Sequence, residues 1–355
     1  MADLQPADVQ DLIKAVLTNQ YKNEVINLMS NLQRHPSYEF MRRAKQTRGS
    51  SLTWTVAYRD NNSARTIGLF DRHNPDVIDL TAQATVPWRG LSCDMAHDVA
   101  EVQMMQGAPE QIFDLIKVRQ DAAWSSYNKK VEQQIFNRPQ DSSDTDNAHG
   151  LLYYVTMENA TTTFGQNGGE ITGFAGGVGG LLSTTATPHK NWNYIFTNAD
   201  YDDLGDAMRD STFLMDYETP YGIDYVKNAL PQYMYFTGLS NIKDLGNIAK
   251  DQNTQVGWDI GLDKKMTFYG MSFRYTPTLD NSAYNRAVYF IDMNDAVYTA
   301  IKGSFMRQNG PVSMGGGQQD TILTQWVTRG NLKLKTRRNH AVFATAAFGT
   351  GRLSV

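Results

Sequence analysis

Cysteine is almost absent from this chain of 355 residues, because Cys93 is the only one. A single thiol cannot form an intrachain disulfide, and a structural zinc site would lack its usual thiolates, so a reducing compartment is the simple inference. Long apolar runs are also absent, since no stretch approaches the ~18 residues that predict a transmembrane helix. The first residues carry acids rather than a basic stretch before an apolar core, so we expect no signal peptide.

Motifs for catalysis and for metal or nucleotide binding are missing as well. The six histidines are scattered without i,i+4 pairing, which gives no zinc-binding pattern. The glycine run at 176–180 is not followed by the lysine of a phosphate-binding loop, so we expect a mobile or tightly turned surface loop. Ser240 and Lys243 have the spacing of an SxxK motif without its partner motif. We therefore expect no enzyme activity, no cofactor and no metal site.

Charge of one sign does not dominate the chain. The net charge is −4 and the isoelectric point about 5.9, which is not typical of a general nucleic-acid-binding protein. Basic residues nevertheless gather at 34–48 and 333–340. A solvated face, a contact with phosphate and a contact with an acidic neighbouring subunit all remain open for these two stretches.

The most informative stretch that is present is an extended ribbon at 49–91. Apolar and aromatic side chains alternate with polar ones along its first half: Leu52, Trp54, Val56 and Tyr58. This alternation is typical of a two-sided strand, and turn-forming residues follow it. An isolated two-stranded ribbon is only marginally stable in water. We therefore expect the ribbon to be covered by another subunit.

A single long helix, predicted over 109–137, follows the ribbon. Pro109 suits the first position of a helix, and at ~1.5 Å per residue the helix would span about 43 Å. Further helices are expected at 7–33, 92–106, 201–215 and 240–252. Strands are expected within 266–281, 287–303 and 320–347. In the last of these, Leu332 and Leu334 alternate with Lys333 and Lys335, which predicts one apolar and one basic face.

This order of elements resembles that of the major capsid proteins of tailed double-stranded DNA bacteriophages, the Johnson-fold family. Local likenesses support the resemblance at 85–89, 114–119, 269–275 and 288–292. Together with the overall order of elements, the resemblance covers most of the chain. The resemblance implies an α+β fold of successive parts. These are an N-terminal arm (1–48), an extended loop (49–91), a peripheral domain with the spine helix (92–218), an axial domain (219–310) and returning peripheral strands (311–355).

The resemblance implies a structural role. The chain is expected to assemble into hexamers and pentamers of an icosahedral head that encloses double-stranded DNA, in a virion assembled in the host cytoplasm. A portal, and separate scaffolding or decoration proteins, are the implied partners, with no membrane. No lysine lies between Lys45 and Lys117, so the loop-to-neighbour isopeptide bond of some members has no donor here. The extended loop begins near residue 50, so no built-in scaffold segment is expected.

The same resemblance places the candidate site residues on contacts between subunits and with DNA. The expected apolar anchors on a neighbour's spine helix or peripheral domain are Trp54, Val56 and Tyr58. The arginines expected to meet acids of the neighbour are Arg59, Arg65, Arg72 and Arg89, although each could instead be solvated. The acids expected to meet them are Asp114, Asp121 and Glu132. The residues expected to face packaged DNA are Lys333, Lys335 and Arg337.

Two other functions remain open at this point. An encapsulin-type compartment would have a similar fold and enclose proteins instead of DNA. A soluble β-rich enzyme or glycan-binding domain would line a pocket with some of the 18 tyrosines and 28 glycines. Size-exclusion chromatography separates a shell from a pocket protein of 39.9 kDa, and the cargo separates the two kinds of shell.

Overall fold

A computed structural model gives the structure of most of the chain. It describes residues 11, 35–59, 64, 66–68, 78–104, 109–215, 232–252, 267–280, 286–313 and 321–348, with the backbone alone at 102–103, 109–114 and 248–252. The helix predicted at 7–33 therefore lies outside the described residues, except for residue 11. Arg65 and Arg72 lie outside them too.

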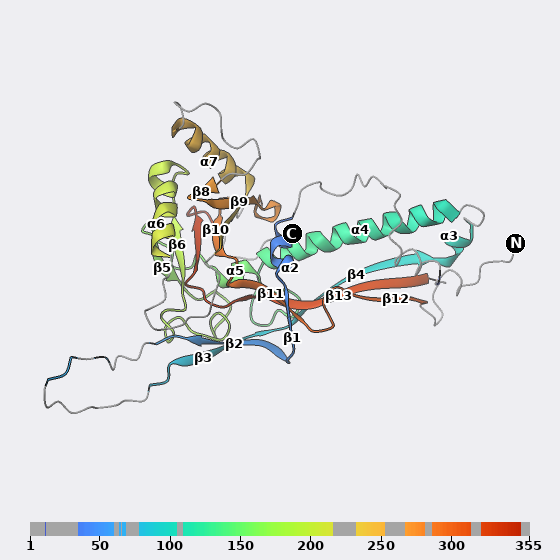
Figure 1. Cartoon of the computed structure of the whole chain (residues 1–355), viewed down its shortest axis with the longest axis horizontal. Helices are drawn as coiled ribbons and strands as arrows, with labels where there is room; N and C mark the ends of the chain where they lie inside the picture. Colours follow the sequence, from blue (N-terminus) through green and yellow to red (C-terminus); the bar gives the residue numbers. More distant parts are fainter. Residues whose placement is uncertain are drawn as a thin grey trace.

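The molecule is elongated and built around two sheets (Figure 1). One end consists of a long helix, α4, lying along a long sheet, and the other end holds a second sheet flanked by the helices α6 and α7. A two-stranded ribbon lies beside the junction of the two ends. This arrangement follows from the sequence pattern, because a helix or sheet with one apolar face has to bury that face against another element.

The long sheet has five strands, and β13 is its central strand. Its strands are β1 (Lys45–Thr47), β4 (Arg89–Asp98), β11 (Ala296–Ile301), β12 (Arg307–Ser313) and β13 (Thr321–Leu334). The first part of β13 pairs with β4 and with β12, and its last part pairs with β11. Side chains alternate between buried and half-buried along β13, as expected for a strand with one covered face.

The helix α4 (Pro109–Phe136) covers this sheet and confirms the long helix predicted at 109–137. Its 28 residues make it about 42 Å long at ~1.5 Å per residue. Trp124 packs against Trp326 of β13, with the ring centroids 5.4 Å apart. Tyr127 forms a hydrogen bond with Thr328 through the two hydroxyl groups. The helix is thus fixed to the sheet by both apolar and polar contacts.

The helix predicted at 92–106 is mostly wrong. Residues up to Asp98 belong to β4, and of the residues described in this range only α3 (Val99–Met104) is helical. The physical reason is the pairing of β4 with β13 over ten residue pairs. This pairing buries Met95 and His97 on one face, so a period of two overrides the local helical preference.

The second sheet has seven strands and mixes parallel and antiparallel pairs. Its strands, in spatial order, are β5 (Gly165–Gly168), β6 (Asn191–Ile195), β14 (His340–Ala344), β10 (Val288–Asp292), β7 (Tyr233–Thr237), β9 (Met271–Tyr275) and β8 (Thr267–Phe268). Stacked rings cross its centre, since Phe290 lies between Tyr233 and Tyr235 with centroid distances of 4.5 Å to both. Such offset stacks add to the stability gained by burial alone.

Helices flank the second sheet where the sequence predicted them. A π-helix, η1 (Tyr201–Gly205), continues into α6 (Asp206–Leu214), and α7 (Leu239–Gln252) follows β7. These helices confirm the predictions at 201–215 and 240–252. Each of the two sheets draws strands from more than one of the domains expected from the resemblance; for example, β14 pairs with β10. The domain boundaries therefore stay a prediction.

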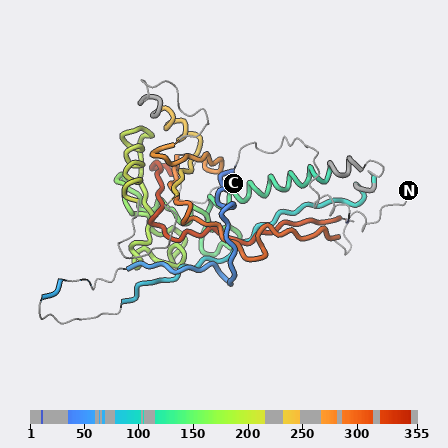
Figure 2. The backbone as a smooth tube through the Cα atoms, viewed as in Figure 1, coloured from blue at the N-terminus to red at the C-terminus, as the bar shows by residue number. Residues whose placement is uncertain are grey.

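The first described segment of the chain lies among its last strands (Figure 2). The helix α2 (Ser37–Arg42) leads into β1, which pairs in parallel with β11. Phe40 of α2 contacts Phe136 at the end of α4 and Phe236 of β7, with ring centroids 6.1 and 5.4 Å away. These three rings join the two ends of the molecule at one apolar junction.

A buried guanidinium group makes a second, polar junction. Arg337, in the turn between β13 and β14, is 1% exposed. It donates hydrogen bonds to the backbone oxygens of Tyr154, His189 and Gly169 at 2.7–3.0 Å. It also donates to the side-chain oxygens of Asn191 (2.9 Å) and Thr156 (3.4 Å). No carboxylate of the described residues is hydrogen bonded to it.

Burial lowers the pKa of Arg337 to about 10, so the group is still a cation at neutral pH. A buried cation is tolerated only when its donors are satisfied, and here five oxygen acceptors surround it. The planar fork of arginine matches this set of acceptors, whereas lysine concentrates its donors on one nitrogen.

We predict that Arg337→Lys lowers the free energy of unfolding by about 2–5 kcal/mol, because several buried acceptors lose their donors. Chemical denaturation followed by circular dichroism measures the change. Arg338→Lys, at the exposed neighbouring position, is the matched control and should leave stability within about 0.5 kcal/mol. Equal stability of the two variants would contradict a structural role for the Arg337 fork.

Candidate subunit-interface surfaces

The ribbon is formed by β2 (Ser51–Ala57) and β3 (Thr81–Pro87), which pair antiparallel along their whole length. Its inner face carries four residues that are buried within the same chain: Leu52, Trp54, Ala84 and Val86. The Trp54 ring lies 6.4 Å from the Tyr154 ring, and the Lys333 ammonium lies 5.4 Å from the Trp54 ring centroid. The root of the ribbon is therefore part of the chain's own core.

The glycine-rich loop forms the other side of this contact. The backbone N–H of Thr85 in β3 donates to the Gly179 oxygen at 2.8 Å, and the Gly179 N–H donates to the Tyr153 hydroxyl at 2.8 Å. Gly177 has a φ of +76°, and a Cβ there would lie 2.2 Å from the Leu181 oxygen, so only glycine fits. The loop is tightly turned and holds the ribbon.

The predicted role of Trp54 as an anchor on a neighbour is wrong, because only 8% of this residue is exposed in the single chain. The alternation that predicted the ribbon was correct, but its first two inward positions face the chain's own body. Further along, Val56 and Tyr58 are half-buried and Arg59 is exposed. The Arg59 guanidinium lies over the Tyr58 ring, 5.2 Å from its centroid. These three residues remain candidates for contact with another subunit.

Two residues that were predicted to form ion pairs between subunits, Arg89 and Glu132, are engaged or buried within their own chain. Arg89 donates to the backbone oxygens of Asn147 and Asp144, at 3.1 and 2.6 Å, so it is already engaged within its own chain. Glu132 is 1% exposed and is not available to a neighbour's arginine, so that prediction is wrong. Burial raises the pKa of Glu132 to about 7.

Of the other predicted acids on α4, Asp121 is half-exposed and remains a candidate. Asp114 lies in the part of α4 where the structure describes the backbone alone. The prediction for Asp114 therefore stays untested.

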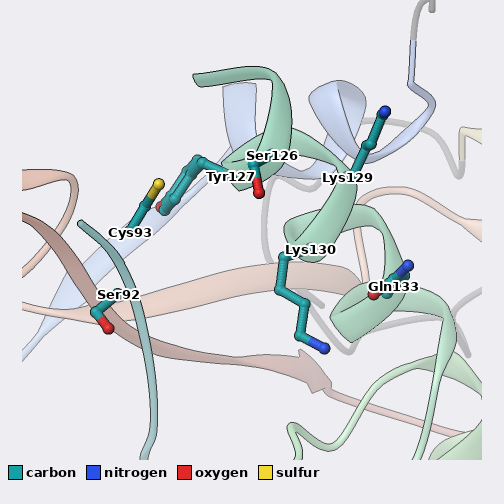
Figure 3. A pocket seen from close by; sticks show the side chains of 7 residues that line it. All are labelled: Ser92, Cys93, Ser126, Tyr127, Lys129, Lys130 and Gln133. Carbon is teal, nitrogen blue, oxygen red and sulfur yellow. The ribbon is translucent and has the colours of Figure 1, made fainter. Parts of the chain in front are cut away.

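A cavity of about 310 Å³ opens between α4 and β4 (Figure 3). Its lining side chains come from β4 on one side and α4 on the other: Ser92, Cys93, Ser126, Tyr127, Lys129, Lys130 and Gln133. The Cys93 thiol donates to the Ala123 oxygen at 3.3 Å, and burial raises its pKa, helped by Asp94. The thiol is thus protonated and unreactive at neutral pH. The two lysines make this cavity a basic surface.

Sequence reasoning missed this basic surface. It considered the acids of α4 as partners for arginines, whereas the adjacent positions Lys129 and Lys130 line the open cavity. The sequence did contain a signal for this surface. Lys129 and Lys130 lie between Tyr127 and Val131, which are buried, and neighbouring positions on a helix point in different directions.

The last part of β13 has one apolar and one basic face, as predicted from the alternation at 332–335. Leu332 and Leu334 are buried, and Lys333 and Lys335 are half-buried on the other face. The Lys335 ammonium donates to the Asn294 oxygen at 2.9 Å and lies 3.6 Å from an Asp295 carboxylate oxygen. Burial lowers the pKa of Lys333, and Lys335 and Lys45 lower it further. Arg337 is buried, so its predicted position facing DNA is wrong.

Large apolar side chains are exposed at the far tip of the seven-stranded sheet. Phe213 and Leu214 at the end of α6 are 69% and 58% exposed, and Tyr269 between β8 and β9 is 57% exposed. The rings of Phe213 and Tyr269 contact each other, with centroids 6.4 Å apart. A cluster of this kind on a single chain is typical of an interaction surface.

No protein-family model and no curated protein matches this chain, but solved structures do. A chain of the cyanophage A-1(L) capsid asymmetric unit has a TM-score of 0.57 and 13% identity, covering 93% of this chain and 99% of that one. A chain of Mycobacterium phage Adephagia has a TM-score of 0.54 and 11% identity, covering 97% and 98%. A chain of the capsid of the native GTA particle has a TM-score of 0.51 and 12% identity, covering 92% and 96%.

The chain therefore has the α+β fold of phage capsid proteins, which confirms the fold that the sequence resemblance implied. No group of three or more metal-ligating side chains occurs within the described residues. In the same part of the chain, none of the helices has the length and apolar character needed to cross a membrane.

We predict that Trp54→Ala lowers the free energy of unfolding by about 3–5 kcal/mol, because a large buried ring is lost from the chain's own core. Urea denaturation of the unassembled protein measures the change. Thr55→Ala, at the exposed next position of β2, is the control. If Trp54→Ala kept full stability and lost only the capacity to assemble, Trp54 would be an anchor between subunits after all.

Proposed function

We propose that this chain is a major capsid protein, which assembles into the hexamers and pentamers of an icosahedral phage head around double-stranded DNA. The observation that carries the proposal is a fold shared along more than nine-tenths of the chain with capsid proteins of phages and of the GTA particle. A portal is a proposed partner of such a head, and separate scaffolding or decoration proteins are optional further partners. The virion is the proposed location, with assembly in the host cytoplasm, and the role is structural, with no catalytic step.

The mechanism of assembly is repeated burial of surface between copies. A stable, specific interface buries roughly 1,600 Å², and aromatic and arginine side chains dominate its energy once they are desolvated. Val56, Tyr58 and Arg59 lie beyond the ribbon root and have surface left for a neighbour. The exposed Phe213–Tyr269 cluster offers a second such surface.

The receiving surface for the ribbon is the spine helix of a neighbouring copy. The cavity between α4 and β4 presents Lys129 and Lys130, and the ribbon carries the exposed Asp79 beside β3. Opposite charges steer association and fix register more than they add affinity. Asp121 of α4 remains a partner for the ribbon's arginines, of which Arg59 is exposed.

The division into arm, extended loop, peripheral domain, axial domain and returning strands is part of this proposal. The position of β2 and β3 beside the body (Figure 1) supports the extended loop, and α4 on the long sheet supports the peripheral domain. The seven-stranded sheet is the body of the axial domain, with β5, β6 and β14 joining it from the flanking ranges.

An encapsulin-type compartment is the alternative that shares this fold. The phage and GTA capsids among the similar structures favour the phage head. Purified shells that contained protein cargo and no DNA would support the compartment instead.

We predict that the purified protein forms closed shells in negative-stain micrographs, and that Tyr58→Ala reduces the yield of shells at least tenfold. The reason is that Tyr58 is half-buried in the single chain, so its loss removes contact area from the neighbour at little cost to the fold. Thr53→Ala, at an exposed position of β2, is the control. A protein that stays monomeric under all assembly conditions would refute the proposed function, whereas normal shells from Tyr58→Ala would refute only this contact.

We propose further that the basic face of β13 contacts packaged DNA through Lys333 and Lys335. Each phosphate contact that is lost lowers the magnitude of the slope of log K against log salt by about 0.9. We therefore predict that Lys333→Gln combined with Lys335→Gln reduces this slope by about 1–2 in titrations of short duplex DNA. Lys243→Gln, an exposed lysine on α7, should leave the slope unchanged. An unchanged slope in the double variant would exclude this face.

A further inference from the structure

Glu132 is a carboxyl group buried where α4 packs against α2. It lies four residues before the end of α4 at Phe136, and 1% of the residue is exposed. Its Oε2 atom accepts a hydrogen bond from the Ser37 backbone N–H at 2.8 Å, whereas Oε1 has no hydrogen-bond partner. Ionising a carboxyl group with so few partners is costly, and a negative charge near the C-terminal end of a helix is disfavoured further.

No positive charge offsets this burial. The titratable and charged groups on the elements packed around the contact include His35, Glu39 with its partner Arg274, Lys129, and Asp280 of η2 (Pro277–Asp280). The basic side chains Arg42 of α2 and Lys130 of α4 are exposed. None of these described groups is bonded to the Glu132 carboxyl. Burial raises the pKa of Glu132, and the bonds from Ser37 lower it only in part. The pKa of His35 is lowered by burial and by Lys129, so His35 is neutral near pH 7.

We propose that Glu132 and Ser37 form a proton-dependent latch, which holds α2 on α4 while the carboxyl group is neutral and loosens when it ionises. The helix α2 connects the chain before it to β1, the edge strand that pairs with β11. Loosening the latch therefore frees α2, through which the N-terminal part of the chain joins the body. The latch lies within one chain, so the inference does not depend on the proposed function.

The raised pKa of Glu132 determines how the opening of α2 depends on pH. The folded pKa of Glu132 is about 7, above the ordinary value of 4.5. A group with a raised pKa stabilises the closed form fully below its ordinary pKa, and that stability is lost as the pH rises through the folded pKa. Between about pH 5 and 7, the equilibrium constant for opening should rise about tenfold per pH unit, and it should level off above pH 7.

Hydrogen exchange of the full-length protein tests the latch. Amides of Ser37–Arg42 are followed from pH 5 to 8, corrected for the intrinsic pH dependence of exchange, with the amides of β13 as the internal reference. Glu132→Gln keeps the shape and the acceptor for Ser37 but cannot ionise, so its opening should be independent of pH. Asp210→Asn, which removes an exposed acid of α6, should keep the slope of the wild-type protein.

Two results would overturn the proposal. One is a wild-type protein whose α2 opening does not change with pH relative to β13. The other is a Glu132→Gln variant with the wild-type slope, which would assign the titration to another group. Should Glu132→Gln not fold, the wild-type profile alone decides, because the latch requires its slope to lie in α2 and to be absent from β13.

Discussion

The structure depends on one buried cation. Arg337 lies between the last strand of the long sheet and the strand that enters the seven-stranded sheet, and its donors reach three other segments of backbone. Removing a charged group from water is costly, so the fold is stable only if all these acceptors are in place together. The geometry of the junction is thereby specified, because a displaced segment would leave the guanidinium or its acceptors unsatisfied.

The ribbon has two parts with different physical roles. Its root is fixed by Trp54 under Lys333, by the backbone bond from Thr85 to Gly179 and by the buried face of β3. On the inner face of the described ribbon, the side chains beyond the root, such as Tyr58, keep surface that can contact another copy. A rigid root with a contact surface beyond it lowers the entropy that association costs, because the orientation of the ribbon is set before a neighbour arrives.

Much of the fold could be predicted from the sequence, and little of the site. The helices α6 and α7 have strong local periodicity, and the spine helix is long and begins at Pro109, so all three were found almost to the residue. The strand β4 was missed because its structure depends on pairing with β13, more than 200 positions later in the chain. Trp54, Glu132 and Arg337 were misplaced for a related reason. Burial of a long side chain depends on which distant segment covers it, and no local pattern records that.

The order of the chain has a consequence for its synthesis. The strands β13 and β14 occupy inner positions of the two sheets, yet they are among the last elements in the sequence. A growing polypeptide therefore cannot close the long sheet until translation has passed Leu334, or the seven-stranded sheet until it has passed Ala344. Before that point the inner face of the ribbon lacks Lys333, and the acceptors of Arg337 lack their donor. Both sheets are thus completed late, after the strands that flank β13 and β14 have already been synthesised, so the fold cannot be built up one sheet at a time in chain order.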